Sequence, residues 1–143
     1  MVDASEIRHG RHVVSSIHAH LVFIPKYRRS IFASKHLSRM EEIFGEVCES
    51  FGATLVEVNG ESNHVHLLVE YPPHIALSRL VNSLKGVSSR LLRKEFPGLS
   101  PHYYRRVLWS PSYFVASCGG APLSIIKQYI ERQTGAGRPM GAR

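Results

Sequence analysis

The apolar positions along this chain repeat with two different periods. Residues 13–24 alternate, with one face formed by Ile17, Ala19, Leu21 and Phe23, and a period of two predicts a half-buried strand. Further segments have the length and composition of strands: residues 53–59, residues 63–70, and a broken segment over 107–109 and 112–118. Asn59-Gly60 separates the second strand from the third, and this dipeptide predicts a hairpin turn.

Two longer segments carry apolar residues at helical spacing. Residues 34–51 form one stripe that Gly52 closes, and Gly is typical of a helix C-terminus. Residues 75–95 form a stronger stripe, which Pro97-Gly98 ends. A third helix is expected from about Pro122 to Gln133, because proline suits the first turn of a helix.

The order of these elements indicates the fold. Strand, helix, strand, strand, helix and strand make the split βαβ, or ferredoxin-like, arrangement of the α+β class. We therefore expect an antiparallel sheet with helices on one face, its first and third strands as central neighbours, and an extra C-terminal helix. Residues 13–133 are expected to be a single domain between a flexible N-terminus (1–12) and a flexible basic tail (134–143).

The charge of the chain changes this picture. Lys and Arg outnumber Asp and Glu by 18 to 11, and the net charge is +7. A basic balance in a small domain points to a polyanionic partner, most often nucleic acid, although a solvated basic surface has the same composition. Cys48 and Cys118 form no CxxC motif, so a reducing cytosol is expected. No apolar run has the length of a membrane span, and the start lacks a signal peptide.

Two histidines stand in the third predicted strand. His64 and His66 lie two apart and therefore point to the same face. Two imidazoles in this arrangement can bind one cation, but partly buried histidines bonded to neighbours would show the same spacing. His18 and His20 repeat the spacing on the first strand. A four-histidine cluster would suit zinc or copper, which no other feature of the chain requires.

Tyr129 and Gln133 lie four residues apart on the expected C-terminal helix and share a face. An amphipathic helix with a half-buried tyrosine would look the same. A free tyrosine has a pKa near 10 and is a poor nucleophile at neutral pH. A divalent cation between the His pair and Gln133 would polarise a phosphoryl group beside Tyr129. Together the two motifs predict phosphodiester cleavage by a tyrosine.

Two basic segments are candidate phosphate-binding surfaces. Lys26, Arg28 and Arg29 flank Tyr27, which suits phosphate contacts beside a stacked base. A second candidate surface, on the 75–95 helix, consists of Lys85, Ser89 and Arg90. A solvated helix face is the alternative reading of that segment. Among the later aromatic residues, we expect Trp109 and Phe114 in the core, and Tyr103 and Tyr104 at the surface, where they could stack on unpaired bases.

Taken together, these motifs resemble the small single-tyrosine HUH transposases of bacterial insertion sequences, the TnpA-type, IS200-like family. The resemblance covers residues 13–133. The segments that carry it are Pro25-Lys26-Tyr27-Arg28-Arg29, His64-Val65-His66-Leu67-Leu68, residues 84–90, residues 108–114 and Tyr129-Ile130-Glu131-Arg132-Gln133.

The resemblance implies a complete activity. The family is ferredoxin-like and forms obligate homodimers with composite active sites. Residues matching His64, His66 and Gln133 hold Mg²⁺ or Mn²⁺, and the residue matching Tyr129 attacks single-stranded DNA, leaving a 5′-phosphotyrosine and a free 3′-OH. A 3′-OH later resolves this link, so no nucleotide cofactor is needed. The DNA ends are recognised as subterminal hairpins. A cytoplasmic, nucleoid-associated protein of a bacterium or archaeon is implied.

The chain departs from the family at a few positions. Relatives often carry an acidic residue where this chain has Asn63, so Glu61 is a candidate ligand or outer contact. Arg132 replaces a common Asn, and His18 is expected to be structural.

Other functions stay open at this point. A domesticated relative that cuts repetitive palindromic elements has the same chemistry. A non-catalytic nucleic-acid-binding ferredoxin-like module would show exposed aromatics on the central strands, where this chain has histidines. A regulatory or metal-binding domain would use Tyr129 only for packing.

Overall fold

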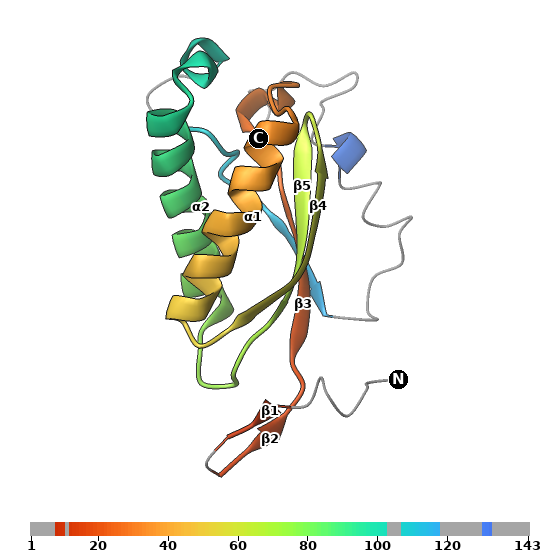
Figure 1. The fold of residues 1–143 in the computed structure, drawn as a ribbon. Helices are drawn as coiled ribbons and strands as arrows, with labels where there is room; N and C mark the ends of the chain where they lie inside the picture. The colour runs from red at the N-terminus through yellow and green to blue at the C-terminus, as the bar shows by residue number, and fades with distance from the viewer. Residues whose placement is uncertain (1–7, 11, 103–106, 118–129, 133–143) are drawn as a thin grey trace.

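The computed structural model describes residues 8–10, 12–102, 107–117 and 130–132 (Figure 1). Some expectations concern residues outside these ranges: the basic tail 134–143, the surface tyrosines Tyr103 and Tyr104, and the predicted catalytic pair Tyr129 and Gln133.

A four-stranded antiparallel sheet forms the centre of the fold, in the order β4-β5-β3-β6. Its strands are β3 (His18–Phe23), β4 (Thr54–Glu61), β5 (His64–Glu70) and β6 (Phe114–Ser117). The helix α1 (Ser34–Ser50) follows β3, and α2 (Leu77–Glu95) follows β5. The first and third predicted strands, now β3 and β5, are central neighbours, so the predicted ferredoxin-like α+β sheet is confirmed.

Both helices pack against one face of the sheet (Figure 1). In β5 the side chains of Val65, Leu67 and Val69 point to this face and are almost fully buried. The alternate residues point to the opposite face, where His64, His66 and Leu68 are only partly buried and Glu70 is buried. A strand with period-two burial thus separates a packed core on one side from polar side chains on the other.

A small hairpin precedes the main sheet. β1 (Arg8–His9) pairs antiparallel with β2 (Val14–Ser15), partly within the segment expected to be flexible. The Arg8 guanidinium donates two hydrogen bonds to the Glu70 carboxylate, through Nε at 2.6 Å and Nη2 at 2.5 Å. Because Glu70 is buried, this bidentate pair ties the hairpin to the end of β5.

The β4–β5 hairpin turns later than predicted. β4 continues through Gly60 and Glu61, and the turn residues are Ser62 and Asn63. The Asn59-Gly60 turn was therefore wrong. A Cβ at Gly60 would lie only 2.9 Å from Leu37 Cδ2 and 3.0 Å from the His64 carbonyl oxygen. Gly60 is small because α1 packs closely on β4, and not because the chain turns there.

The helices agree with their predicted spans to within two residues. After α1, Gly52 has a φ of 72°, the left-handed conformation expected of a glycine that closes a helix. The short 3₁₀ segments η2 (Lys26–Arg28) and η3 (Pro97–His102) were not predicted. Of the broken fourth strand, only 114–117 forms β6, and Trp109 makes an isolated bridge to Pro25.

The predicted core aromatics differ in burial. Trp109 is buried, and its indole N–H donates to Ser88 Oγ at 2.9 Å. Phe114 is only partly buried because it pairs with Val22 on the face opposite the helices.

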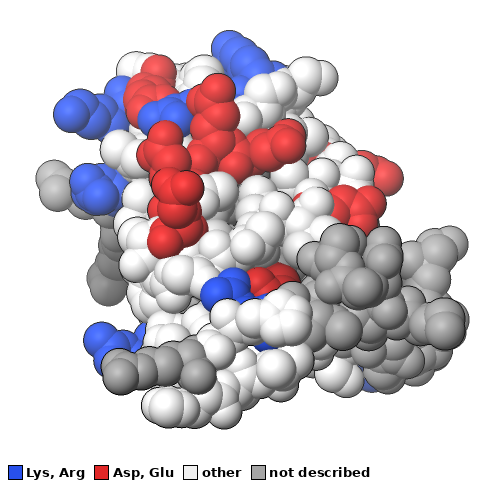
Figure 2. Space-filling view, turned by 60° about the horizontal axis from the view of Figure 1, so that its bottom comes forward, with Lys and Arg blue, Asp and Glu red and all other residues white. Residues whose placement is uncertain are grey.

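The exposed side of α1 is acidic. It carries Glu41, Glu42, Glu46 and Glu49, and Figure 2 shows acidic side chains gathered in one band. Arg39 lies beside this band and forms ion pairs with Glu42 and with Glu95 of α2. Among the described residues, neither α1 nor α2 combines the length and the apolar character needed to cross a bilayer.

Candidate functional site

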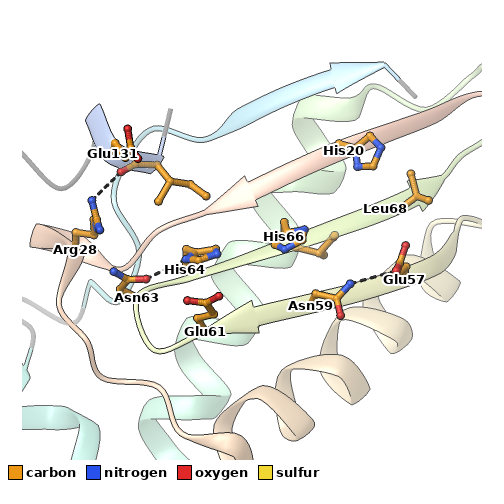
Figure 3. A pocket seen from close by; sticks show the side chains of 12 residues that line it. His20, Arg28, Glu57, Asn59, Glu61, Asn63, His64, His66, Leu68 and Glu131 are labelled. Atoms are coloured by element: carbon orange, nitrogen blue, oxygen red, sulfur yellow. Dashed lines mark hydrogen bonds between the residues drawn. The ribbon is translucent and has the colours of Figure 1, made fainter. Parts of the chain in front are cut away.

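A pocket of about 540 Å³ opens on the face of the sheet opposite the helices (Figure 3). Its floor is formed by side chains of β3, β4 and β5, which alternate with the core residues of the same strands. Its rim is formed by Arg28 and Asn63 and by Ile130 and Glu131 of the C-terminal segment. The pocket therefore brings together three regions of the sequence, and Arg28 and Ile130, which are 102 residues apart, meet at its rim.

His64 and His66 lie side by side on the pocket floor. Their rings are nearly parallel, with centroids 5.9 Å apart and an interplanar angle of 17°. The structure thus confirms that both side chains share one face of the strand. Burial lowers the pKa of both imidazoles because it disfavours the charged form, although Glu61 and Glu57 partly oppose this. Both rings are therefore neutral at pH 7, and each keeps one nitrogen lone pair.

His20 and His18 follow the same alternation on β3. His20 lies opposite Leu68 and lines the pocket next to His66. His18 lies opposite Glu70, at the far end of the strand from His64, and is buried. In the part of the chain that the structure describes, no three His, Cys, Asp or Glu side chains are placed to hold a metal ion by themselves. The four-histidine cluster does not form.

The carboxylates of β4 complete the floor. Glu61 pairs with His64 across the strands, and Asn59 pairs with His66. Asn59 donates through Nδ2 to Glu57 Oε2 at 3.2 Å. Glu61 was a candidate ligand or outer contact, and it lines the pocket on the same side as the two histidines (Figure 3).

Arg28 enters the pocket from the loop after β3. Its backbone φ is 48°, and that of Tyr27 is 65°, so two successive residues with a Cβ adopt the left-handed conformation. The side chain of Arg28 reaches the C-terminal segment and donates through Nη1 to the Ile130 carbonyl oxygen at 2.9 Å (Figure 3). Burial lowers the pKa of Arg28, with Glu131 opposing the shift.

None of the remaining loop residues lines the pocket: Tyr27 and Arg29 are exposed, and Lys26 is half-buried. Tyr27 is 42% exposed, and its ring lies 5.6 Å from Lys26 Nζ and 5.8 Å from the Arg29 guanidinium. An exposed ring close to two cations is a suitable surface for a base and its phosphates. Of the four loop residues predicted to contact DNA, Arg28 alone turns inward.

The second predicted phosphate surface lies on α2, in the helix layer, and does not adjoin the pocket. Lys85 Nζ donates to the Ser110 carbonyl at 2.7 Å and lies over the rings of Phe23 and Tyr113. Burial lowers the pKa of Lys85 to about 8. Lys85 therefore holds the segment before β6, rather than standing free on a solvated helix face.

The other two candidates on this helix behave differently. Ser89 accepts hydrogen bonds from Arg93 Nε through its carbonyl at 3.0 Å and its hydroxyl at 3.3 Å. Arg90 is exposed.

Sequence reasoning missed several pocket residues. His20 and Glu57 carried a usable signal, because they alternate with apolar residues on strands that flank β5. Arg28 carried none for its inward position, since neither Tyr27 nor Arg28 is a residue type that favours the left-handed conformation. Tyr129 and Gln133 lie outside the described residues, but their neighbours Ile130 and Glu131 line the pocket.

A scan against protein families matches residues 13–133, most of the chain, to the model described as "Transposase IS200 like". The chain belongs to the IS200-like transposase family. One such transposase, that of insertion sequence element IS200 from Salmonella typhimurium, is 33% identical over 114 residues, which cover 80% of this chain and 74% of the relative. The ISDra2 transposase TnpA from Deinococcus radiodurans is 28% identical over 128 residues, 90% of this chain and 91% of that protein.

Solved structures give the same fold. A crystal structure of a candidate transposase from Deinococcus radiodurans superposes with a TM-score of 0.79 at 31% identity, covering 88% of this transposase and 97% of that chain. A REP-associated tyrosine transposase bound to a REP hairpin superposes with a TM-score of 0.54 at 10% identity, covering 87% and 68%. The second likeness concerns the fold alone.

Proposed function

We propose that this IS200-like transposase cleaves and rejoins single-stranded DNA through a covalent link to Tyr129. The observation that carries the proposal is the meeting of two elements at one pocket. The His64–His66 pair forms the floor, and the segment directly after Tyr129 lies at the rim, where Arg28 bonds its Ile130 carbonyl.

The pocket residues fit a divalent cation. Two neutral imidazoles on one face offer nitrogen ligands, and Glu57 and Glu61 add negative charge that favours a cation. Mixed nitrogen and oxygen ligands suit Mn²⁺ and are compatible with Mg²⁺. We propose His64, His66 and the Gln133 amide oxygen as the ligands. When bound, the cation would polarise the scissile phosphate and stabilise its developing charge.

The reaction balances without a nucleotide cofactor. The Tyr129 oxygen attacks the phosphorus, a new P–O bond forms, and the bond from phosphorus to the 3′ oxygen breaks. The phenol loses its proton to solvent, and the released 3′ oxygen takes one up. Attack of a 3′-OH on the phosphotyrosine reverses these changes and joins two DNA ends. The phosphodiester energy is kept in the covalent link.

Hairpin-ended single-stranded DNA is the proposed partner. The REP-associated transposase, which shares the fold, is bound to a REP hairpin, and this supports a similar surface here. Lys26, Tyr27 and Arg29 flank the rim residue Arg28 in the chain, and they would contact the strand beside the hairpin. A homodimer with composite sites is part of the same proposal.

A non-catalytic binding module on this sheet is the second candidate, and one observation speaks against it. Such a module stacks bases on aromatic side chains of the central strands. The face of β3 and β5 opposite the helices carries histidines, Val22, Leu68 and Glu70, and no aromatic residue in these two strands points to it.

The deciding experiment mixes the protein with labelled single-stranded DNA that carries an element end, with Mg²⁺ or with EDTA, on a denaturing gel. The proposal expects a covalent band that requires the metal and disappears in Tyr129→Phe. Tight hairpin binding with no covalent band would instead identify a binding module or an inactive descendant of a transposase.

A further inference from the structure

The loop after β3 places its two arginines in opposite environments. Arg29 has an ordinary extended φ of −75° and is exposed. Arg28 has a φ of 48° and is turned into the pocket rim. A left-handed conformation is costly for a residue with a Cβ and persists where the surroundings fix it. The contacts that Arg28 makes therefore hold it in this conformation.

Arg28 contacts two elements that are distant in the sequence. Nη1 donates to the Ile130 carbonyl at 2.9 Å. Nε and Nη2 lie 3.1 and 3.2 Å from the side chain of Asn63, and donate to it when the amide oxygen faces them. In that orientation the Asn63 amide nitrogen donates to His64 Nδ1 at 2.9 Å. One guanidinium thus joins the C-terminal segment, the β4–β5 turn and the first histidine.

We propose that Arg28 is a positioning residue that clasps the C-terminal segment 130–132 onto the pocket and competes with His64 for the Asn63 amide. The proposal deepens the proposed function, because the clasped residues 130–132 stand between Tyr129 and Gln133 in the sequence. It also differs from the expectation that all three cations of this loop contact phosphate. Arg28 acts on the protein, whereas Lys26 and Arg29 lie outside the pocket and stay candidates for DNA contact.

The Asn63 amide makes this clasp depend on which nitrogen of His64 carries the hydrogen. The Asn63 amide forms a hydrogen bond with His64 Nδ1 in either orientation, so Nε2 is the His64 nitrogen that remains to bind a cation. A neutral imidazole with a free Nε2 carries its hydrogen on Nδ1 and needs an acceptor there. The amide must then turn its oxygen to His64, which brings its nitrogen to the Arg28 guanidinium. Asn63 therefore serves either Arg28 or a cation-ready His64.

An aspartate at position 63 would remove this competition. One carboxylate oxygen would accept from His64 Nδ1 and the other from Arg28. For Asn63→Asp we expect Mn²⁺ to bind about tenfold more tightly by isothermal titration calorimetry, because a carboxylate also raises the basicity of the ligand. Unchanged or weaker Mn²⁺ binding would overturn the part of the proposal that runs through Asn63.

The clasp itself is tested without DNA or metal. Hydrogen exchange of peptides containing residues 130–132 is compared in the full chain, in Arg28→Ala and in the matched control Arg29→Ala. Loss of a charged hydrogen bond should speed exchange in Arg28→Ala by about tenfold, with no change in Arg29→Ala. Equal exchange in the two variants would overturn the clasp. Arg28→Lys keeps one donor for Ile130 and should be intermediate, which guards against a loop that simply misfolds.

Activity then separates a clasp from a phosphate contact. A positioning role lowers the rate of covalent complex formation at saturating DNA in Arg28→Ala and leaves DNA affinity within about twofold, with partial rescue by Arg28→Lys. A phosphate contact instead weakens affinity and reduces the salt slope by about one. Since the exchange experiment needs no cleavage, the clasp can stand if the tyrosine chemistry fails, and the chemistry can stand if the clasp fails.

Discussion

The orientation of the His64 and His66 side chains depends on their neighbours in β5. His66 lies between the buried Val65 and Leu67, and His64 directly precedes Val65, so neither can turn away from the pocket without moving a core residue. Their rings are held nearly parallel by the backbone of β5. Such fixed placement is what a cation site requires, because the ligands lose little freedom when the ion binds.

Replacing either histidine should separate binding from chemistry. In His64→Ala or His66→Ala we expect covalent complex formation to fall by at least about a hundredfold, because a ligand of the proposed cation is lost. Hairpin affinity should stay within about twofold, as measured by fluorescence anisotropy. His74→Ala is the matched control, since His74 is exposed before α2. A parallel loss of hairpin binding would count against the assigned role.

At the scale of elements, the start of α1 depends on a histidine. Ala33, the residue before the helix, has no side chain that can cap it, and its N–H donates to His36 Nδ1 at 2.8 Å. His36 is buried, and its ring packs edge-on against Phe96 at 4.8 Å. Burial lowers the pKa of His36, and the nearby Lys35 lowers it further. A neutral imidazole is therefore part of the helix start.

This helix start should make stability depend on pH. The folded pKa of His36 lies below the ordinary value of 6.5, so below pH 6.5 the unfolded chain binds more protons than the folded one. The free energy of unfolding should therefore fall between pH 7.5 and 5.5, by at most about 1.4 kcal/mol per pH unit for each such histidine. His64 and His66 shift in the same direction and add to the effect. Urea denaturation at both pH values measures the change.

The variant His36→Gln isolates the contribution of His36 to this pH dependence, because glutamine does not titrate. This variant should lose less stability than the parent chain over the same pH interval. An equal loss in both proteins would mean that His36 does not contribute.

The secondary-structure elements differed in how well the sequence predicted their position. The alternation of β5 and the apolar stripes of α1 and α2 were sufficient, because each element buries one regular face. The Asn59-Gly60 turn failed because a glycine required for close packing against Leu37 resembles a glycine required for a turn. Lys85 was read as exposed because helical periodicity does not show that its ammonium reaches the Ser110 carbonyl. Contacts between distant segments, such as Arg28 with Ile130, leave no local pattern.

For the whole molecule, strand order could be predicted because few topologies connect these elements with short links. The position of the histidine pair on a central strand followed from that order. The oligomeric state does not follow from the structure of one chain. The described residues that line the pocket include three imidazoles and two carboxylates, and the remaining proposed ligand, Gln133, would in the proposed dimer come from either copy.

The proposed dimer has a direct measurement. Light scattering coupled to gel filtration should give about twice the chain mass of 16.1 kDa at micromolar concentration. Mixing Tyr129→Phe with His64→Ala tests composite sites: if the helix docks on the partner, the mixture regains covalent complex formation that neither variant shows. A monomer at micromolar concentration would contradict the composite arrangement.

The division of the sheet into a packed face and a pocket face has an evolutionary consequence. Along β5, selection for a stable fold acts on Val65, Leu67 and Val69, while selection for chemistry acts on the residues between them. Neighbouring residues of one strand are thus under different selection. A new specificity can arise at Leu68 or His20 with little loss of foldability. A lineage that has lost mobility could therefore erode its pocket while its fold endures.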